Sequence, residues 1–163
     1  MGQQLPTGVI DGRRAFTEAL RLPLLALGDA STRELWLIDD GFEAWPLDEP
    51  AVLEAMSQWH RAAGRQVHMI GADFDAVARR HPRFANWRRS RVHGFDAWQP
   101  LEAERSELGA VLLAGDHAVE LLDREHWRAR IQLSPAALRA LAENAASLLR
   151  RCESAWPVTT LGL

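Results

Sequence analysis

Apolar residues recur along the chain in two patterns, short continuous runs and stripes at helical spacing. Two of the runs, residues 34–40 (ELWLIDD) and 66–71 (QVHMIG), have the length of buried strands and end in aspartate or glycine. Between them a stripe begins after Asp48 and Pro50 and ends at Gly64, which predicts an amphipathic helix. Its apolar members are Val52, Leu53, Met56, Trp59 and Ala63. Strand, helix and strand in this order favour neighbouring parallel strands covered by helices.

Helical spacing marks two further segments in the first half of the chain. One is expected to begin at Asp11, whose carboxylate can cap it, and to be bent or split at Pro23. The other is expected to begin at Asp73, to break near Pro82 and to resume as far as Trp87. Proline disfavours helical geometry in the residue before it, and this gives the break its position.

The second half of the chain predicts more strands and one long helix. A third strand is expected within residues 91–98, and residues 109–123 indicate an antiparallel hairpin that turns at residues 115–117. Residues 128–133 are a candidate for one more strand. The last helix is expected over residues 134–152, where serine and proline stand at its start.

These elements fit a single α/β domain over residues 1–163. The expected architecture is a mixed, mainly parallel sheet with helices on both faces. A flavodoxin-like or Rossmann-like three-layer sandwich is the alternative.

Composition is that of a globular protein, with 47% hydrophobic and 25% charged residues. No run approaches the roughly 18 apolar residues of a membrane span, and the N-terminus lacks the pattern of an export signal. A single cysteine, Cys152, rules out an intramolecular disulfide and is consistent with a reducing compartment. We therefore expect a cytoplasmic protein that makes no membrane contact.

The chain contains no lysine, so all 19 of its Lys and Arg positions are arginines. Schiff-base chemistry and a Walker-type lysine on a phosphate are thereby excluded. A GC-rich bacterial genome, which favours arginine codons, is the simplest cause. Arginine is also the better bidentate ligand for phosphate, which is the functional alternative.

The order of these elements resembles one lobe of a phospholipase D-like protein, over roughly residues 11–156. The resemblance rests on the first helix, the strands 34–40 and 66–71 with the helix between them, and the hairpin. It implies the phospholipase D-like fold and the pairing of two lobes, here as a homodimer. In that family the hairpin carries His-x-Lys-x4-Asp, in which the histidine attacks phosphorus.

The catalytic positions that the resemblance assigns are largely lost in this sequence. Gly109 stands in the histidine place, Val111 in the lysine place and Asp116 in the aspartate place. Because there is no lysine anywhere, the family mechanism is excluded in any register. We therefore expect a degenerate active site, no cofactor, and a non-catalytic binding or regulatory module.

The strongest local charge lies in residues 79–93, here called the arginine-rich segment, which has six arginines and no acid. The rest of the chain has 22 acidic residues and 13 arginines. The segment therefore has a formal charge of +6 and the rest of the chain one of −9. Arginines interleaved with aromatics suit phosphate neutralisation and base stacking, which predicts an anionic ligand or nucleic acid. The alternative is a solvated helix whose aromatics face the core. The candidate contacts are Arg79, Arg80, Arg83, Trp87, Arg88, Arg89, Arg91 and His93.

Acidic residues follow the expected strands and support a second hypothesis. Asp39, Asp40, Asp73, Asp75 and Asp96 could converge on a hard cation at the carboxyl ends of parallel strands. A metal-dependent phosphoesterase is therefore the alternative function. Turns and helix caps also use aspartate, so no metal ligand is assigned.

The six histidines lack zinc-ligand spacing. His93 and His126 are the two candidates for ligand contacts, because each is expected near a strand end. The seven tryptophans are expected to supply much of the core, since the chain has no tyrosine.

Overall fold

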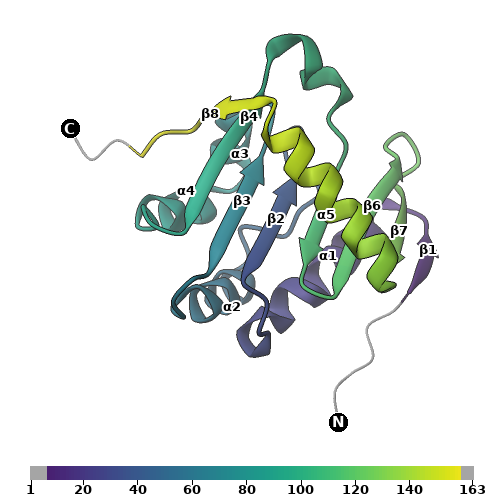
Figure 1. Ribbon diagram of the computed structural model, residues 1–163, viewed down its shortest axis with the longest axis horizontal. Coiled ribbons are helices and arrows are strands. Elements are labelled where there is room, and N and C mark those ends of the chain that lie inside the picture. The colour runs from purple at the N-terminus through teal and green to yellow at the C-terminus, as the bar shows by residue number, and fades with distance from the viewer. Residues whose placement is uncertain (1–6, 159–163) are drawn as a thin grey trace.

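The computed structural model describes residues 7–158, in which eight strands form one sheet in the order β1-β7-β6-β5-β2-β3-β4-β8 (Figure 1). The hairpin expected over residues 109–123 is confirmed as β5 and β6, and the candidate strand after it as β7. The strands are β1 (Gly8–Ile10), β2 (Glu34–Ile38), β3 (Gln66–Ile70), β4 (Phe95–Pro100), β5 (Val111–Ala114), β6 (His117–Asp123), β7 (Arg128–Gln132) and β8 (Cys152–Ser154).

The sheet is mixed, as expected, but the expectation of a mainly parallel sheet is wrong. Of the seven strand pairings in the described part of the chain, only β2 with β3 and β3 with β4 are parallel. The strand-helix-strand pattern covers β2 to β4 alone. The hairpin and two short edge strands supply the antiparallel pairs.

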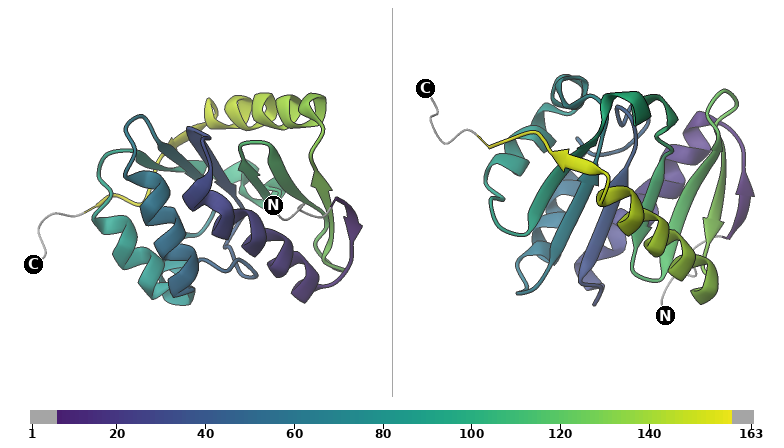
Figure 2. Two further views of the ribbon diagram at one scale, coloured as in Figure 1. Left: turned by 90° about the horizontal axis from the view of Figure 1, so that it is seen from below. Right: turned by 45° about the horizontal axis from the view of Figure 1, so that its top comes forward.

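Helices cover both faces of the sheet, which confirms that part of the expectation. The helices α1 to α4 lie on one face and α5 crosses the other (Figure 2). They are α1 (Arg13–Leu25), α2 (Pro50–His60), α3 (Phe74–Arg80), α4 (Pro82–Arg89) and α5 (Pro135–Leu149), with short 3₁₀ helices at Ala26–Asp29 and Glu102–Glu107. No helix within residues 7–158 combines the length and apolarity that crossing a membrane requires.

The larger core lies under α1 to α4, where side chains such as Phe16, Leu37 and Met56 are fully buried. A smaller core lies under α5 and includes Trp36 and Ile70. Three tryptophans are buried and four are half-buried, so the expected packing role of tryptophan is confirmed.

Local signals for helix ends were partly right. The Asp73 side chain caps α3 by accepting a hydrogen bond from the Ala76 backbone N–H at 3.0 Å, and the chain breaks at His81 before Pro82. Asp11 does not cap α1, because Gly12 takes the cap position and Asp11 pairs with Arg128 instead.

Two further expectations about helices need correction, because Pro23 does not split its helix and the last helix is shorter than expected. Pro23 lies inside α1, where the helix continues to Leu25 and then tightens into a 3₁₀ turn. The last helix ends at Leu149, and Cys152 begins β8, which pairs with β4. The helical spacing of apolar residues in the sequence includes Cys152 although it lies beyond the helix, because Cys152 packs against the same small core as α5.

Candidate functional site

The end of the sheet at which strand β2 stops brings together positions that were considered separately in the sequence. Asp39 and Asp40 follow the end of β2, and Ile38 pairs with Val111 at the start of β5. Gly109 and Val111 therefore lie beside the strand-end aspartates. Asp116 lies in the hairpin turn beyond the other end of β5, so the three positions assigned by the resemblance do not form one site.

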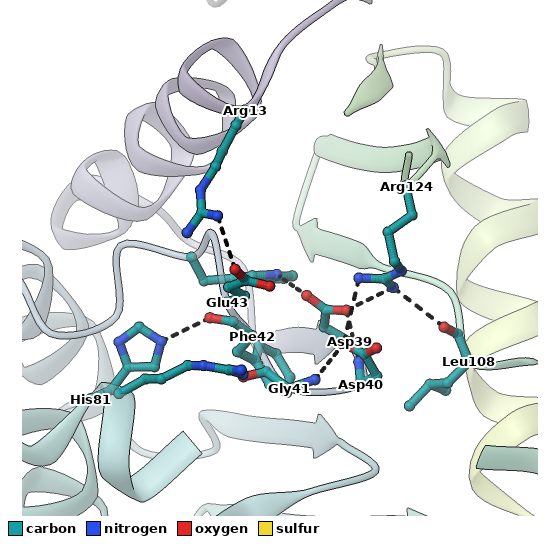
Figure 3. Close-up of polar contacts among 11 residues, drawn as sticks. Arg13, Asp39, Asp40, Gly41, Phe42, Glu43, His81, Leu108 and Arg124 are labelled. Atoms are coloured by element: carbon teal, nitrogen blue, oxygen red, sulfur yellow. Dashed lines mark hydrogen bonds and ion pairs between the residues drawn. The ribbon is translucent and has the colours of Figure 1, made fainter. Parts of the chain in front are cut away.

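Asp39 is the centre of this end of the sheet, and its side chain is almost completely buried. The Trp45 indole N–H donates to one carboxylate oxygen at 2.8 Å. The other oxygen accepts from Arg124 at 2.9 Å and from the Asp40 backbone N–H at 2.7 Å (Figure 3). We call residues 39–45 together with Arg124 the β2 edge.

Burial raises the pKa of the Asp39 carboxyl to about 6, although the Arg124 guanidinium beside it acts in the opposite direction. The neighbouring Asp40 carboxylate adds to the increase. Asp39 therefore takes up a proton in a mildly acidic solution, and the ion pair with Arg124 weakens when it does.

The loop after β2 is held from several sides. Arg80 donates to the Gly41 carbonyl at 2.9 Å, and His81 donates through Nε2 to the Phe42 carbonyl at 2.8 Å. Phe42 has a φ of 57°, a left-handed conformation that a large residue keeps only when its surroundings enforce it. Arg80 and His81, two members of the arginine-rich segment, thus brace the β2 edge, and Figure 3 shows the contact of His81 with the Phe42 carbonyl.

A cleft of about 420 Å³ adjoins the β2 edge. Its charged lining consists of three carboxylates and two guanidinium groups, from Asp40, Glu43, Asp73, Arg80 and Arg105. Because charges of both signs line it, this cleft does not favour a polyanion.

The strand-end aspartates do not converge on a cation, which corrects the metal-site hypothesis. Asp96 is the second residue of β4, at the other end of the strand from the β2 edge, and accepts a hydrogen bond from Gln66. Asp73 is used as a helix cap and Asp75 is exposed on α3. No group of three His, Cys, Asp or Glu side chains in the described range has the geometry of a metal site.

The arginine-rich segment forms α3 and α4 and the turn after them. Arg79, Arg83, Arg89 and His93 are exposed on it. Among the side chains that the structure describes, none of the segment's arginines forms an ion pair with a carboxylate. The arginines that do so all lie elsewhere and are Arg13, Arg21, Arg105, Arg124, Arg128 and Arg151.

Three candidate residues of this segment point inwards. Arg88 is 6% exposed and donates to the Trp156 carbonyl at 2.9 Å. Arg91 and the Trp87 indole N–H both donate to the Ser57 hydroxyl oxygen, at 3.2 and 2.7 Å. The indole of Trp87 is therefore packed against α2, and the expected base-stacking role of this ring is not supported by its position.

The two histidines chosen as ligand candidates lie apart. His93 is exposed in the turn before β4, and His126 pairs with Asp123 in the turn after β6. Arg124, from that same turn, is the residue that sequence reasoning missed. Its partner Asp39 is 85 positions away, and no local pattern signals such a pair.

No family model matches the sequence, and no curated protein matches it significantly. Solved structures do resemble it. TrmBL2, an archaeal chromatin protein whose structure shows a novel mode of DNA binding, has a TM-score of 0.64 at 12% identity, over 94% of this chain and 56% of that chain. NucT from Helicobacter pylori has a TM-score of 0.59 at 8% identity, over 92% of this chain and 99% of the NucT chain. Nuc from Salmonella typhimurium, a phospholipase D family member, has a TM-score of 0.52 at 10% identity, over 84% of this chain and 91% of the Nuc chain.

At these identities the comparisons show the fold alone. The fold is phospholipase D-like, as the resemblance of element order implied. This chain spans little more than half the length of the TrmBL2 chain.

Proposed function

We propose that this protein is a non-catalytic module of phospholipase D-like fold that contacts the phosphate backbone of a nucleic acid through the exposed arginines of α3 and α4. The observation that carries the proposal is that, among the described side chains, no carboxylate forms an ion pair with a guanidinium group of the arginine-rich segment. The Asp48 carboxylate lies at the start of α4 but accepts from the backbone N–H groups of Arg83 and Phe84. Guanidinium groups without an internal partner are free to bind phosphate oxygens bidentately. TrmBL2, with which the chain shares its fold, binds DNA, which agrees with this assignment.

The residues at the positions that the family resemblance assigns to the catalytic histidine and lysine support a binding role without hydrolysis. Gly109 has no side chain to attack phosphorus, although a Cβ at this position would meet open space. Val111 offers no charge to a phosphate. The nearby Asp39 carboxylate is engaged by three donors and is unsuited to metal binding.

The rest of the surface charge would limit how a nucleic acid can approach. Outside the arginine-rich segment the chain has an excess of nine acidic residues, which repel phosphates. Contact through α3 and α4 is therefore favoured over contact through other faces.

The test is a salt series of binding measurements with single-stranded RNA, single-stranded DNA and duplex DNA. The variant Arg79→Gln/Arg83→Gln removes two exposed, unpaired charges. We expect the slope of log affinity against log salt to fall by about 2 for duplex DNA, because each lost phosphate contact removes roughly one released counterion. The matched control is Arg14→Gln/Arg139→Gln, which removes two exposed arginines from α1 and α5.

Salt-independent or undetectable binding by the wild type to all three nucleic acids would reject the proposal. An equal loss in both double variants would reject the assignment to α3 and α4, because it would indicate an effect of net charge alone.

We further propose that the chain acts as a homodimer in the cytoplasm of a bacterial cell. Pairing is suggested by the family resemblance, which implies that two such lobes associate, and the compartment by the free thiol of Cys152. Light scattering at micromolar concentration is expected to give twice the 18.3 kDa chain mass. A monomer mass across that range would exclude the dimer.

A further inference from the structure

A small cavity lies between the α3–α4 pair and residues 155–158, here called the C-terminal segment. Its volume is about 220 Å³. Arg88, Arg89 and Trp156 line it together with Ala78, Ala85, Pro157 and Val158. Two arginines and no carboxylate contribute to this lining, in contrast with the cleft at the β2 edge.

The Arg88 guanidinium is buried with most of its hydrogen-bonding capacity unused. One terminal nitrogen donates to the Trp156 carbonyl, but Nε and Nη1 have no hydrogen-bond partner among the described residues. Burial lowers the pKa of the Arg88 guanidinium, and the charge of Asp96 only partly opposes this effect. A buried cation with free donors destabilises the fold unless an anion satisfies it.

Aromatic rings offset part of this cost. The guanidinium carbon lies 4.8 Å from the centre of the Phe95 ring and 5.5 Å from that of Trp156. The contact with the ring faces does not use the N–H donors, which lie in the plane of the guanidinium. These N–H groups are therefore still available to an oxygen ligand.

We propose that this cavity binds a phosphate group, held between the guanidinium groups of Arg88 and Arg89. A tetrahedral oxyanion is small enough for 220 Å³, and its oxygens suit two forked donors. The free nitrogens of Arg88 are buried, so phosphate reaches them only when the side chains around them shift. The Trp156 carbonyl, which holds the third nitrogen, competes with phosphate for the guanidinium. The site shares Arg89 with the exposed arginines of α4, but Arg79 and Arg83, which the backbone-contact test removes, do not line the cavity.

Calorimetric titration with inorganic phosphate, at constant ionic strength set by chloride, tests the site. We expect saturable binding by the wild type and at least a tenfold weaker affinity in Arg89→Gln. Arg88→Met, which keeps much of the side-chain volume, is expected to bind no phosphate. The matched control is Arg83→Gln, an exposed arginine of the same helix outside the cavity, which is expected to bind like the wild type.

A second ligand pair distinguishes the source of the phosphate group. A preference for a 5′-phosphorylated oligonucleotide over its unphosphorylated form, competed by inorganic phosphate, identifies a terminal phosphate of a nucleic acid. Binding of inorganic phosphate without that preference identifies a free anion. Either result supports the site.

The proposal is overturned if neither inorganic phosphate nor the phosphorylated oligonucleotide binds saturably. It is also overturned if Arg88→Met binds phosphate as the wild type does. Should Arg88→Met fail to fold, Arg88→Lys retains the charge without the fork, and unchanged phosphate affinity in both Arg88→Lys and Arg89→Gln would contradict the site. Loss of backbone binding in Arg79→Gln/Arg83→Gln with phosphate binding intact separates this site from the proposed function.

Discussion

The β2 edge and the arginine-rich segment use the same residue type in opposite ways. At the β2 edge, Arg124 meets the buried Asp39 carboxylate at 2.9 Å and Asp40 at 3.4 Å. In the arginine-rich segment, no described carboxylate forms an ion pair with any of the six guanidinium groups. Arginine therefore pairs with a buried carboxylate in the first region, whereas the exposed Arg79, Arg83 and Arg89 of the second are available to a ligand.

This difference separates two explanations for an arginine-rich sequence. Codon bias alone would place arginines at the surface without regard to partners. The pairing of Arg124 with the buried Asp39 carboxylate goes beyond codon bias, whereas the exposed arginines of α3 and α4 fit either explanation until binding is measured. Experiments that change one region and leave the other intact test this reading.

The largest effect is expected for Asp39→Asn, as a change in the pH dependence of stability. The pKa of Asp39 rises from 3.8 to about 6 on folding, so the folded protein binds this proton more tightly. Its contribution to stability is present below pH 4 and is lost as the pH rises through 6. Asparagine at this position cannot ionise, so the variant lacks this loss. The free energy of unfolding of the variant minus that of the wild type should therefore increase by up to about 3 kcal/mol as the pH rises from 4 to 7.5.

Urea unfolding of both proteins at a series of pH values gives this difference directly. Asp75→Asn is the control for the loss of one exposed carboxylate on α3. Parallel profiles of Asp39→Asn and wild type would show that Asp39 titrates alike in the folded and unfolded chains.

The next effect is expected for Arg124→Gln, which leaves the Asp39 carboxylate without its cation. We expect a loss of about 2 kcal/mol in the free energy of unfolding at pH 7.5, since a hydrogen bond to a buried charge is lost. The loss should shrink at pH 5, where Asp39 is largely protonated. Arg128→Gln is the matched control, because its pair with Asp11 is exposed on both sides. Equal losses in the two variants would mean that burial of Asp39 is unimportant.

The sequence predicted the main elements because their signals are local. The helix over α2 and the strands β2 and β3 follow from apolar spacing and from turn residues within a few positions. The edge strands β1 and β8 have three residues each and form only by pairing with distant strands. Strands of that length carry no periodicity to detect.

The candidate site was harder to predict, as two adjacent residues illustrate. Arg88 is buried and Arg89 is exposed, although both belong to the same charged run. Arg88 stands four positions after the fully buried Phe84 and so shares the inward face of α4. The position of each residue around the helix would therefore have been enough to predict that Arg88 is buried and Arg89 is exposed. The pairing of Asp39 with Arg124 depends on the register of the hairpin beside β2, which spacing along the chain does not reveal.

A smaller effect is expected for the exposed pair of Arg13 and Glu43, which also braces the loop after β2. Both side chains are 51% exposed, so a double-mutant cycle should give a coupling of about 0.5 kcal/mol. The coupling should fall further in 1 M salt, because exposed charges are screened. The corresponding cycle for Asp39 and Arg124 should retain most of its coupling. A larger coupling for the exposed pair would reverse the proposed order of the two contacts.

The smallest effect is expected for Arg83→Gln on the exposed side of α4. The Arg83 side chain has no carboxylate partner among the described residues, and its backbone N–H, which donates to Asp48, is retained in the variant. The free energy of unfolding should therefore change by no more than about 0.5 kcal/mol, with a gain as readily as a loss. Urea unfolding at pH 7.5 measures it. A loss well above that range would show that the arginine stabilises the fold, and a reduced nucleic-acid affinity in Arg79→Gln/Arg83→Gln could then no longer be ascribed to direct contact.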